Sequence, residues 1–334
     1  MTKISDTITI RGREIKNRIT YLPVVTFSFK GDTIDACADG EDYFGSQHLA
    51  HYTAIAEGGA GIVYVQGTDA GGILDETRQW TPGSKQMLTK ITDAVHANGA
   101  LAMIQLSWGG DRVTDLNSLT TEDLLLKQRE LLEAAIAVGA LGFDGLEFHF
   151  GHTFLLCKML DTEANRRTDR FGGSLEKRAS IITDIIPEIR QKNGEDFILA
   201  VRMGAELPAR ETAVETARYL EQNGIDILNI THSMKPPMEA PEGFPLSGMV
   251  YGGSLIKQAV SIPVIGVGGI TTREDADLLL GSGYADIVGV ARAVLADYDW
   301  PKKVLADAQI RKCIGCRDCF WFSDDTKCPA RLKG

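Results

Sequence analysis

The fold is decided by a pattern that residues 263–292 show in full, PVIGVGGITTREDADLLLGSGYADIVGVAR. Two short apolar runs, Pro263–Val267 and Asp286–Val290, flank a helical pattern at Arg273–Leu280. Apolar runs without alternation are typical of strands buried on both faces, and strands that alternate with helices form parallel sheets. The segment therefore predicts a strand–helix–strand unit of an α/β protein.

The same unit recurs along the whole chain. Six further strands are predicted, at Ile19–Pro23, Gly61–Gln66, Leu101–Leu106, Gly145–Phe150, Ile198–Met203 and Asp226–Ile230. The helices between them are predicted at Gln47–Glu57, Lys85–Asn98, Thr121–Val138, Leu175–Lys192, Thr212–Asn223 and Leu255–Val260. Eight units predict a closed (β/α)₈ (TIM) barrel. An open doubly wound sheet competes with it, but no strand leads into a Gly-x-Gly-x-x-Gly turn.

Two segments lie outside the repeat. Thr7–Ile15 alternates like a small hairpin that would plug the barrel bottom, and Pro301–Ala308 is predicted to form a short helix. We expect residues 1–308 to form the barrel and residues 309–334 a separate cysteine-rich tail.

Composition narrows the function classes. The 334 residues include 35 Lys and Arg against 45 Asp and Glu, a net charge of −10, which disfavours nucleic acid as a partner. The N-terminus lacks the features of a signal peptide, and no apolar run reaches the roughly 18 residues that span a membrane. We therefore expect a cytoplasmic enzyme that acts on a small molecule without membrane partners; a homo-oligomer is compatible with these data.

Glycines follow the last two strands, at the usual phosphate position of a TIM barrel. They lie in Gly266-Val-Gly268-Gly269 and Gly289-Val-Ala291-Arg292. Backbone N–H groups approach an anion closely where no side chain intervenes. The pattern predicts a phosphate-bearing ligand, with a simple tight turn as the alternative for Gly268 and Gly269.

Four polar residues end other strands. His149 and His152 can reach one cavity and donate two hydrogen bonds to a carbonyl oxygen; metal ligation or a structural role is the alternative. Gln105 and Arg202 suit a flavin, with Arg202 near the N1/C2 carbonyl side and Gln105 at the pyrimidine edge. A salt bridge or a core amide is the alternative for these two.

Three other histidines carry weaker signals. His48 and His51 share the spacing of the strand-end pair, but they fall on a predicted helix, and we expect them on its solvated face. His232 follows the sixth predicted strand and borders the mouth.

Two longer stretches carry a family resemblance. Residues 142–156, GFDGLEFHFGHTFLL, and 165–176, NRRTDRFGGSLE, resemble the old yellow enzyme (NADH:flavin oxidoreductase) family of FMN-dependent barrels. Shorter matches follow the family's order from about residue 5 to 305: Lys16-Asn-Arg-Ile19, Ile104-Gln-Leu106, Val201-Arg202, Val267-Gly-Gly-Ile270 and Val290-Ala-Arg292.

The resemblance implies FMN and a site for a small substrate. FMN would be held by Pro23, Val24, Val25, Gly67, Gln105, Arg202, Gly268, Gly269, Ala291 and Arg292. His149 and His152 would bind the activating group of the substrate over the flavin. NADH or NADPH is the implied electron donor.

The chain departs from the family pattern at two positions. Members that reduce enones usually have a proton-donating Tyr two residues after the second histidine, where this chain has Phe154. The position beside the flavin N5/C4 carbonyl, often Cys or Thr, is Val25 here.

The cysteine tail predicts a metal centre. Cys313, Cys316 and Cys319 form a CxxCxxC, and Cys328 is followed by Pro329, as in ferredoxin-like ligation of a [4Fe–4S] cluster. Structural zinc is the alternative. The tail is basic, although the chain as a whole is acidic. The aromatic residues 320–322 are expected either to shield the cluster from solvent or to dock the tail on the barrel.

The tail also resembles a subgroup that contains 2,4-dienoyl-CoA reductase and trimethylamine dehydrogenase, whose barrels carry a cluster motif and then a nucleotide-binding module. This sequence stops at Gly334, so we expect a separate electron-transfer protein. The favoured function is reduction of the C=C bond of an α,β-unsaturated carbonyl compound. Amine dehydrogenation or demethylation, or a flavin electron-transfer subunit without its own substrate, are the alternatives that Phe154 keeps open.

Overall fold

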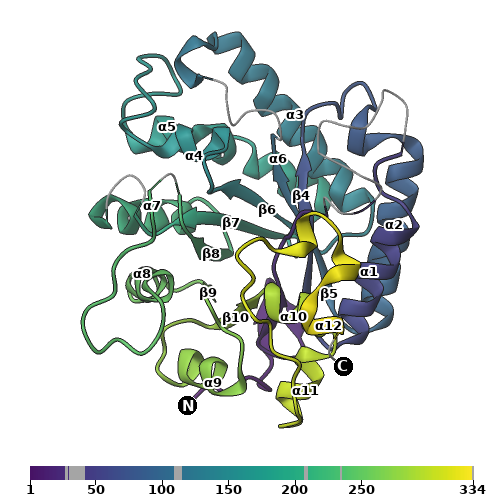
Figure 1. Cartoon of the computed structure of the whole chain (residues 1–334). Helices are drawn as coiled ribbons and strands as arrows, with labels where there is room; N and C mark the ends of the chain where they lie inside the picture. Colours follow the sequence, from purple (N-terminus) through teal and green to yellow (C-terminus); the bar gives the residue numbers. More distant parts are fainter. Residues whose placement is uncertain (27–28, 30–41, 109–114, 207–209, 234, 333–334) are drawn as a thin grey trace.

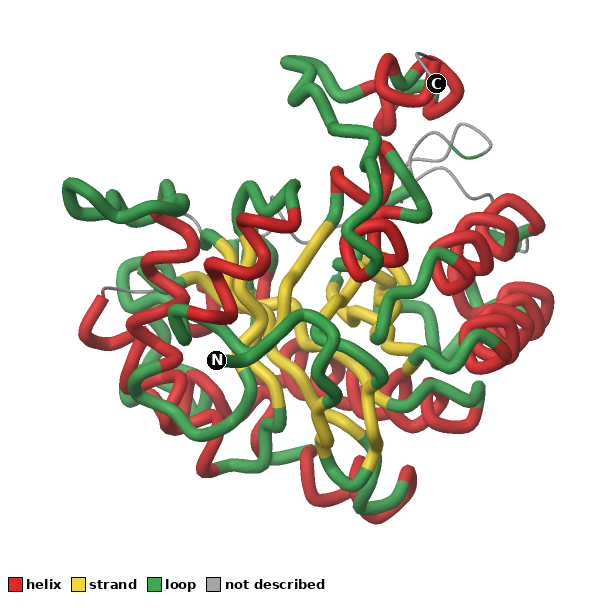
Figure 2. The backbone as a smooth tube through the Cα atoms, turned by 90° about the horizontal axis from the view of Figure 1, so that it is seen from below, coloured by secondary structure: helices red, strands yellow, loops and turns green. Residues whose placement is uncertain are grey.

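The structure is a computed structural model that describes residues 1–26, 29, 42–108, 115–206, 210–233 and 235–332. Its centre is a closed barrel of eight parallel strands in the order β10-β3-β4-β5-β6-β7-β8-β9. The strands are β3 (Ile19–Tyr21), β4 (Ile62–Asp69), β5 (Leu101–Ser107), β6 (Gly145–Phe150), β7 (Ile198–Gly204), β8 (Ile227–Thr231), β9 (Val264–Val267) and β10 (Ile287–Val290). The predicted TIM barrel is confirmed (Figures 1 and 2).

Helices form the outer layer around these strands (Figure 2). They are α1 (Ser46–Glu57), α2 (Pro82–Ala97), α3 (Thr121–Ala140), α4 (Leu155–Leu160), α5 (Leu175–Thr183), α6 (Ile186–Asn193), α7 (Arg210–Gln222), α8 (Gly248–Lys257), α9 (Arg273–Gly281), α10 (Arg292–Ala296) and α11 (Trp300–Leu305). Local signals set several starts. Thr272, for example, accepts from the Asp275 N–H at 3.1 Å while the Asp275 carboxylate accepts from the Thr272 N–H at 3.0 Å, a reciprocal cap on α9.

Two predicted helices differ from the observed ones. The predicted helix 175–192 is divided into α5 and α6, because Pro187 has no N–H to donate and its ring disfavours a continuous helix across the junction. Helix α8 begins earlier than the predicted Leu255, at Gly248. The prediction missed this start because Gly252 interrupts the helical pattern. Glycine is required at this position, since a Cβ there would lie 2.6 Å from the Ala205 Cβ.

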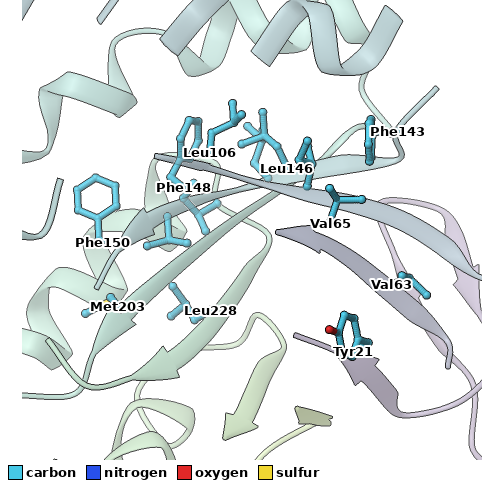
Figure 3. Close-up of a cluster of buried hydrophobic side chains, with 14 of the residues drawn as sticks. Tyr21, Val63, Val65, Leu106, Phe143, Leu146, Phe148, Phe150, Met203 and Leu228 are labelled. Carbon is cyan, nitrogen blue, oxygen red and sulfur yellow. The ribbon is translucent and has the colours of Figure 1, made fainter. Parts of the chain in front are cut away.

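The strands are buried on both faces, which explains their unbroken apolar runs. Their outward side chains pack against the helices, as Val65, Leu106 and Phe148 do in Figure 3. Their inward side chains form a second core with the hairpin β1 (Ile8–Ile10) and β2 (Arg13–Ile15). Ile10 and Ile15 belong to this inner core, so the predicted hairpin does plug the barrel.

Aspartates tie neighbouring strands together at the entries of three strands. The carboxylates of Asp144, Asp226 and Asp286, which precede β6, β8 and β10, each accept a backbone N–H of the preceding strand at 2.8 Å. Asp226 also accepts from Arg190 of α6 at 2.7 Å. This pair therefore joins two strands and a helix.

The tail follows α11 and lies against the barrel near α1 and α10 (yellow in Figure 1). It contains two short 3₁₀ turns, at Phe320–Phe322 and Asp325–Lys327, and α12 (Pro329–Leu332). Lys333, one of its basic residues, lies outside the described residues. None of the helices in the described ranges is long and apolar enough to cross a membrane.

We expect Asp226→Ala to lower the free energy of unfolding by about 3–5 kcal/mol, because it leaves the buried Arg190 charge without its partner. Asp196→Ala is the control. It removes an exposed partner of Arg13 and should cost less than about 1 kcal/mol. Urea denaturation measures both, and equal losses would contradict a structural role for the buried pair.

Candidate active site

The parallel register of the barrel brings the predicted polar residues together at the mouth. Gln105 on β5 is paired with Glu147 on β6, and His149 on β6 with Arg202 on β7. Arg202 in turn is paired with Asn229 on β8. All five are buried. Four neighbouring strands thus present one continuous polar surface above the apolar interior of the barrel.

Glu147 is the centre of this polar surface and is fully buried. Its two carboxylate oxygens accept from Gln105 Nε2 and Asn229 Nδ2, each at 2.7 Å. Burial raises the pKa of Glu147, and the nearby Arg202 charge opposes that rise. No role was predicted for Glu147 or Asn229 from the sequence. One signal for Glu147 lies in its spacing, because a residue two positions before His149 lies on the same face of the strand.

Arg202 is incompletely satisfied by the protein. Its side chain donates from Nη2 to Thr231 Oγ1 at a long 3.4 Å, and its Nε has no hydrogen-bond partner among the described residues. Arg202 is only 8% exposed, and a buried donor left unpaired costs about 1–3 kcal/mol. The electron-rich N1/C2 edge of a flavin ring fits this donor. The arrangement supports the flavin interpretation of Arg202 over a simple salt bridge.

Gly67 leaves the side-chain amide of Gln105 accessible. It lies at a register shift of β4, and a Cβ there would come within 3.1 Å of Gln105 Oε1. Glycine at this position therefore leaves space beside the side-chain carbonyl oxygen of Gln105. The amide nitrogen of Gln105, Nε2, is already bonded to Glu147. A planar flavin ring in contact with Gln105 would need this space.

The loop after β9 requires glycine. Gly268 and Gly269 have φ values of 130° and 79°, in the region that other residues rarely adopt. A Cβ at 268 would lie 2.4 Å from Ser247 Oγ, whereas at 269 it would meet open space. The bare backbone beside open space fits the predicted approach of a phosphate.

Barrel closure brings together the remaining residues that were predicted to contact FMN. Pro23, Val24 and Val25 follow β3, and Ala291 and Arg292 follow its neighbour β10. A hydrogen bond of 2.9 Å from the N–H of the residue before Pro23 to the Val290 carbonyl joins these two ends. Arg292 is exposed and also lines the cysteine pocket described below.

The two strand-end histidines meet as predicted. His149 Nε2 and His152 Nδ1 are 3.2 Å apart, and His152 Nε2 is 3.0 Å from Thr231 Oγ1. His152 has a positive φ of 57°, a conformation that costs energy in a residue with a side chain and is frequent at functional sites. Thr231 thereby links the histidine pair to Arg202.

Two rings complete the surroundings of the pair. The ring of His232 lies 4.6 Å from that of His152, and the ring of Phe154 lies 5.0 Å from that of His149. The structure therefore brings His232 to the site, as its position after the sixth strand suggested. Phe154 occupies the place where the family usually has its proton donor, and it has no proton to give.

The prediction for His48 and His51 is wrong. They are 1% and 3% exposed, not on a solvated helix face. His48 Nε2 lies 2.9 Å from Thr26 Oγ1, and His51 bridges the hydroxyls of Tyr21 and Tyr298 at 3.2 and 2.9 Å. This face of α1 is covered by the end of β3 and by the tail, and burial lowers the pKa of His51 well below its usual value.

The tail brings its four cysteines to one pocket. Cys313, Cys316, Cys319 and Cys328 are half-buried free thiols and line it together with Arg292, Leu295, Ala296, Ile314, Phe320, Trp321, Pro329 and Ala330. In the described part of the chain, no three His, Cys, Asp or Glu side chains are arranged around a single point as ligands of one metal ion. Four thiols around a mainly apolar pocket nevertheless form a donor set that suits an iron–sulfur cluster.

Comparison with known proteins decides the family. Residues 113–310, more than half of the chain, match the NADH:flavin oxidoreductase / NADH oxidase family. The chain belongs to this family. The resemblance to old yellow enzymes is thereby confirmed. The family supports FMN and NADH or NADPH as cofactors.

Several similar proteins and structures are longer than this chain. A NADH oxidase of Thermoanaerobacter brockii is 29% identical over 90% of this chain and 51% of its own length. A cinnamate reductase of Clostridium sporogenes is 27% identical, over 94% of this chain and 54% of its own. The structure of a 2-naphthoyl-CoA reductase shares the fold, with a TM-score of 0.80 and 22% identity over 96% of this chain and 55% of that one. The chain thus spans about half the length of these relatives.

We expect His149→Ala and His152→Ala to weaken binding of a phenolic ligand by about tenfold or more each, because each removes one donor to the phenolate oxygen. FMN should stay bound in both variants. Titration of the flavin absorbance band measures the affinity. Unchanged affinity in both variants would rule out the assigned role.

Proposed function

We propose that the chain is an FMN-dependent reductase of α,β-unsaturated carbonyl compounds, with a [4Fe–4S] cluster at Cys313, Cys316, Cys319 and Cys328 that relays electrons. The observation that carries the proposal is the His149–His152 pair, linked through Thr231 to the under-satisfied Arg202. The cinnamate reductase among the relatives supports reduction of a C=C bond next to a carboxyl group.

The site residues would hold FMN in three places. Gln105 and Arg202 would contact the ring, Pro23–Val25 would pack along it, and the backbone of Gly268 and Gly269 with Ala291 and Arg292 would take the phosphate. Reduced FMN, when bound, supplies a hydride to the β-carbon of the substrate. The basic side chain of Arg202 stabilises the negative charge that the reduced ring carries near N1.

The histidine pair acts on the substrate oxygen. His149 and His152 lie 3.2 Å apart, so their ring N–H groups can converge on one carbonyl oxygen. Two donors stabilise the negative charge that this oxygen gains as the β-carbon accepts hydride. Thr231 fixes the ring of His152 through its 3.0 Å contact and so maintains the direction of its donor.

A proton must then reach the α-carbon, and Phe154 cannot supply it. His232 lies beside His152, is partly accessible to solvent, and has a ring N–H group. We assign the proton donation to His232. In this proposal His232, which follows β8, takes the role of the tyrosine that the family usually places in the segment after β6.

We expect His232→Gln to slow oxidation of the reduced enzyme by an enone at least about tenfold, because general acid catalysis contributes about 10²–10⁴. Reduction of FMN by NADH should not change. The double variant His232→Gln/Phe154→Tyr should recover part of the rate, since a phenol carries a transferable proton. Stopped-flow flavin absorbance follows both half-reactions. An unaltered rate in His232→Gln would remove His232 from the mechanism.

Phe154 also favours a second candidate, oxidation of an amine, which needs no proton donor to carbon. One experiment separates the two. Protein purified without oxygen is assayed for FMN, iron and sulfide, then mixed with NADH, NADPH or methylated amines. We expect the pyridine nucleotides to bleach the flavin and cinnamate-type acids or enones to restore it. Bleaching by amines alone would favour the oxidative candidate.

The cluster has its own test. Cys316→Ser should lose most of the iron and sulfide and the broad absorbance of the cluster, whereas FMN should remain. Zinc in place of iron after anaerobic purification would support the structural-zinc alternative. A colourless protein after reconstitution with FMN, iron and sulfide would contradict the proposal as a whole.

A further inference from the structure

Trp321 is the main buried contact of the tail with the barrel. It is 3% exposed, although its neighbours Phe320 and Phe322 are 38% and 48% exposed. Its indole Nε1–H donates to the Val25 carbonyl at 3.0 Å. Its ring packs against Phe29 and His51 at centroid distances of 5.6 and 4.9 Å. A side chain of the tail thus reaches the loop that follows β3.

The same indole also belongs to the cysteine pocket. Trp321 lines that pocket together with all four cysteines and follows Cys319 by two residues. From the other end of the tail, the Arg331 guanidinium lies 5.6 Å from its ring and 4.4 Å from the ring of Tyr298. Arg331 is itself fixed by a hydrogen bond of 2.7 Å to the Leu295 carbonyl. The position of Trp321 therefore depends on how both ends of the pocket fold.

The loop that Trp321 holds is also anchored at Thr26. The N–H of Thr26, the residue after Val25, donates to Gln66 Oε1 at 2.9 Å, and its hydroxyl lies 2.9 Å from His48. These bonds come from the barrel and α1. The bond to Val25 comes from the tail, and it reaches the segment to which we assign FMN contacts.

We propose that Trp321 is a positioning residue that couples occupation of the cysteine pocket to FMN binding at Pro23–Val25. Metal-centre binding supplies folding free energy to a short segment such as this tail. Once the tail is ordered, the indole N–H fixes the Val25 carbonyl and with it the flavin-contacting backbone. Because such coupling is reciprocal, bound FMN also stabilises the loaded tail. The inference rests on the proposed function.

The test is a thermodynamic cycle on the full chain. FMN affinity is measured without oxygen, by quenching of flavin fluorescence, for the wild type and Trp321→Phe, each with the cluster reconstituted and with it removed by a chelator. In the loaded protein we expect Trp321→Phe to weaken FMN binding about two- to tenfold, the effect of one hydrogen bond. Cluster removal should weaken binding similarly in the wild type and have little further effect in Trp321→Phe.

Controls separate coupling from a general packing defect. Phe322→Leu alters the exposed aromatic residue next in the chain and should leave FMN affinity unchanged. Iron and sulfide contents should match the wild type in both variants. Amide hydrogen exchange of residues 22–26 should be slower in cluster-loaded than in cluster-free wild type, a measurement that needs no variant.

The outcomes are distinct. Equal FMN affinity with and without the cluster, and equal exchange of residues 22–26, would overturn the coupling and leave both cofactor assignments standing. A loss of affinity in Trp321→Phe that is the same with and without the cluster would reduce Trp321 to a packing role and also overturn the coupling. Failure of the wild type to bind FMN or iron would instead contradict the proposed function.

Discussion

The pairing of β3 with β10 is the interaction on which the site depends. Ile19–Tyr21 and Val288–Val290 are separated by most of the chain, yet they lie in register and close the barrel. Closure brings the loop after β3 beside Ala291 and Arg292, and it gives the tail that follows α11 a surface on which to pack. Without this pairing, the polar barrel mouth, the loop at Gly268 and Gly269, and the four cysteines of the tail would have no fixed relation.

Burial of polar residues in the barrel mouth costs desolvation free energy, which hydrogen bonds between these residues offset. Glu147 is satisfied by two amide donors, and its charge lies near Arg202. Arg202, in contrast, keeps an N–H without a partner among the described residues. The mouth thus combines a satisfied carboxylate with a guanidinium that still has one N–H to donate, an arrangement that favours an electron-rich partner.

The sequence was sufficient for the barrel and for much of its mouth. The eight strands were visible because both of their faces are apolar, and Gln105, His149 and Arg202 were recognisable because they stand at strand ends. Glu147 and Asn229 were not assigned, since a partner on a neighbouring strand depends on register. His48 and His51 were misplaced because the segments that cover them are distant in sequence. The split at Pro187 was a local signal that a long helical pattern obscured.

The aspartates before β6, β8 and β10 strengthen three of the strand pairs of the barrel. Asp144 joins β6 to β5, Asp226 joins β8 to β7, and Asp286 joins β10 to β9. Each carboxylate accepts a backbone N–H of the strand before it, so opening any of these three pairs at its entry breaks a side-chain bond as well as the strand ladder. The entries of these pairs should therefore resist local unfolding.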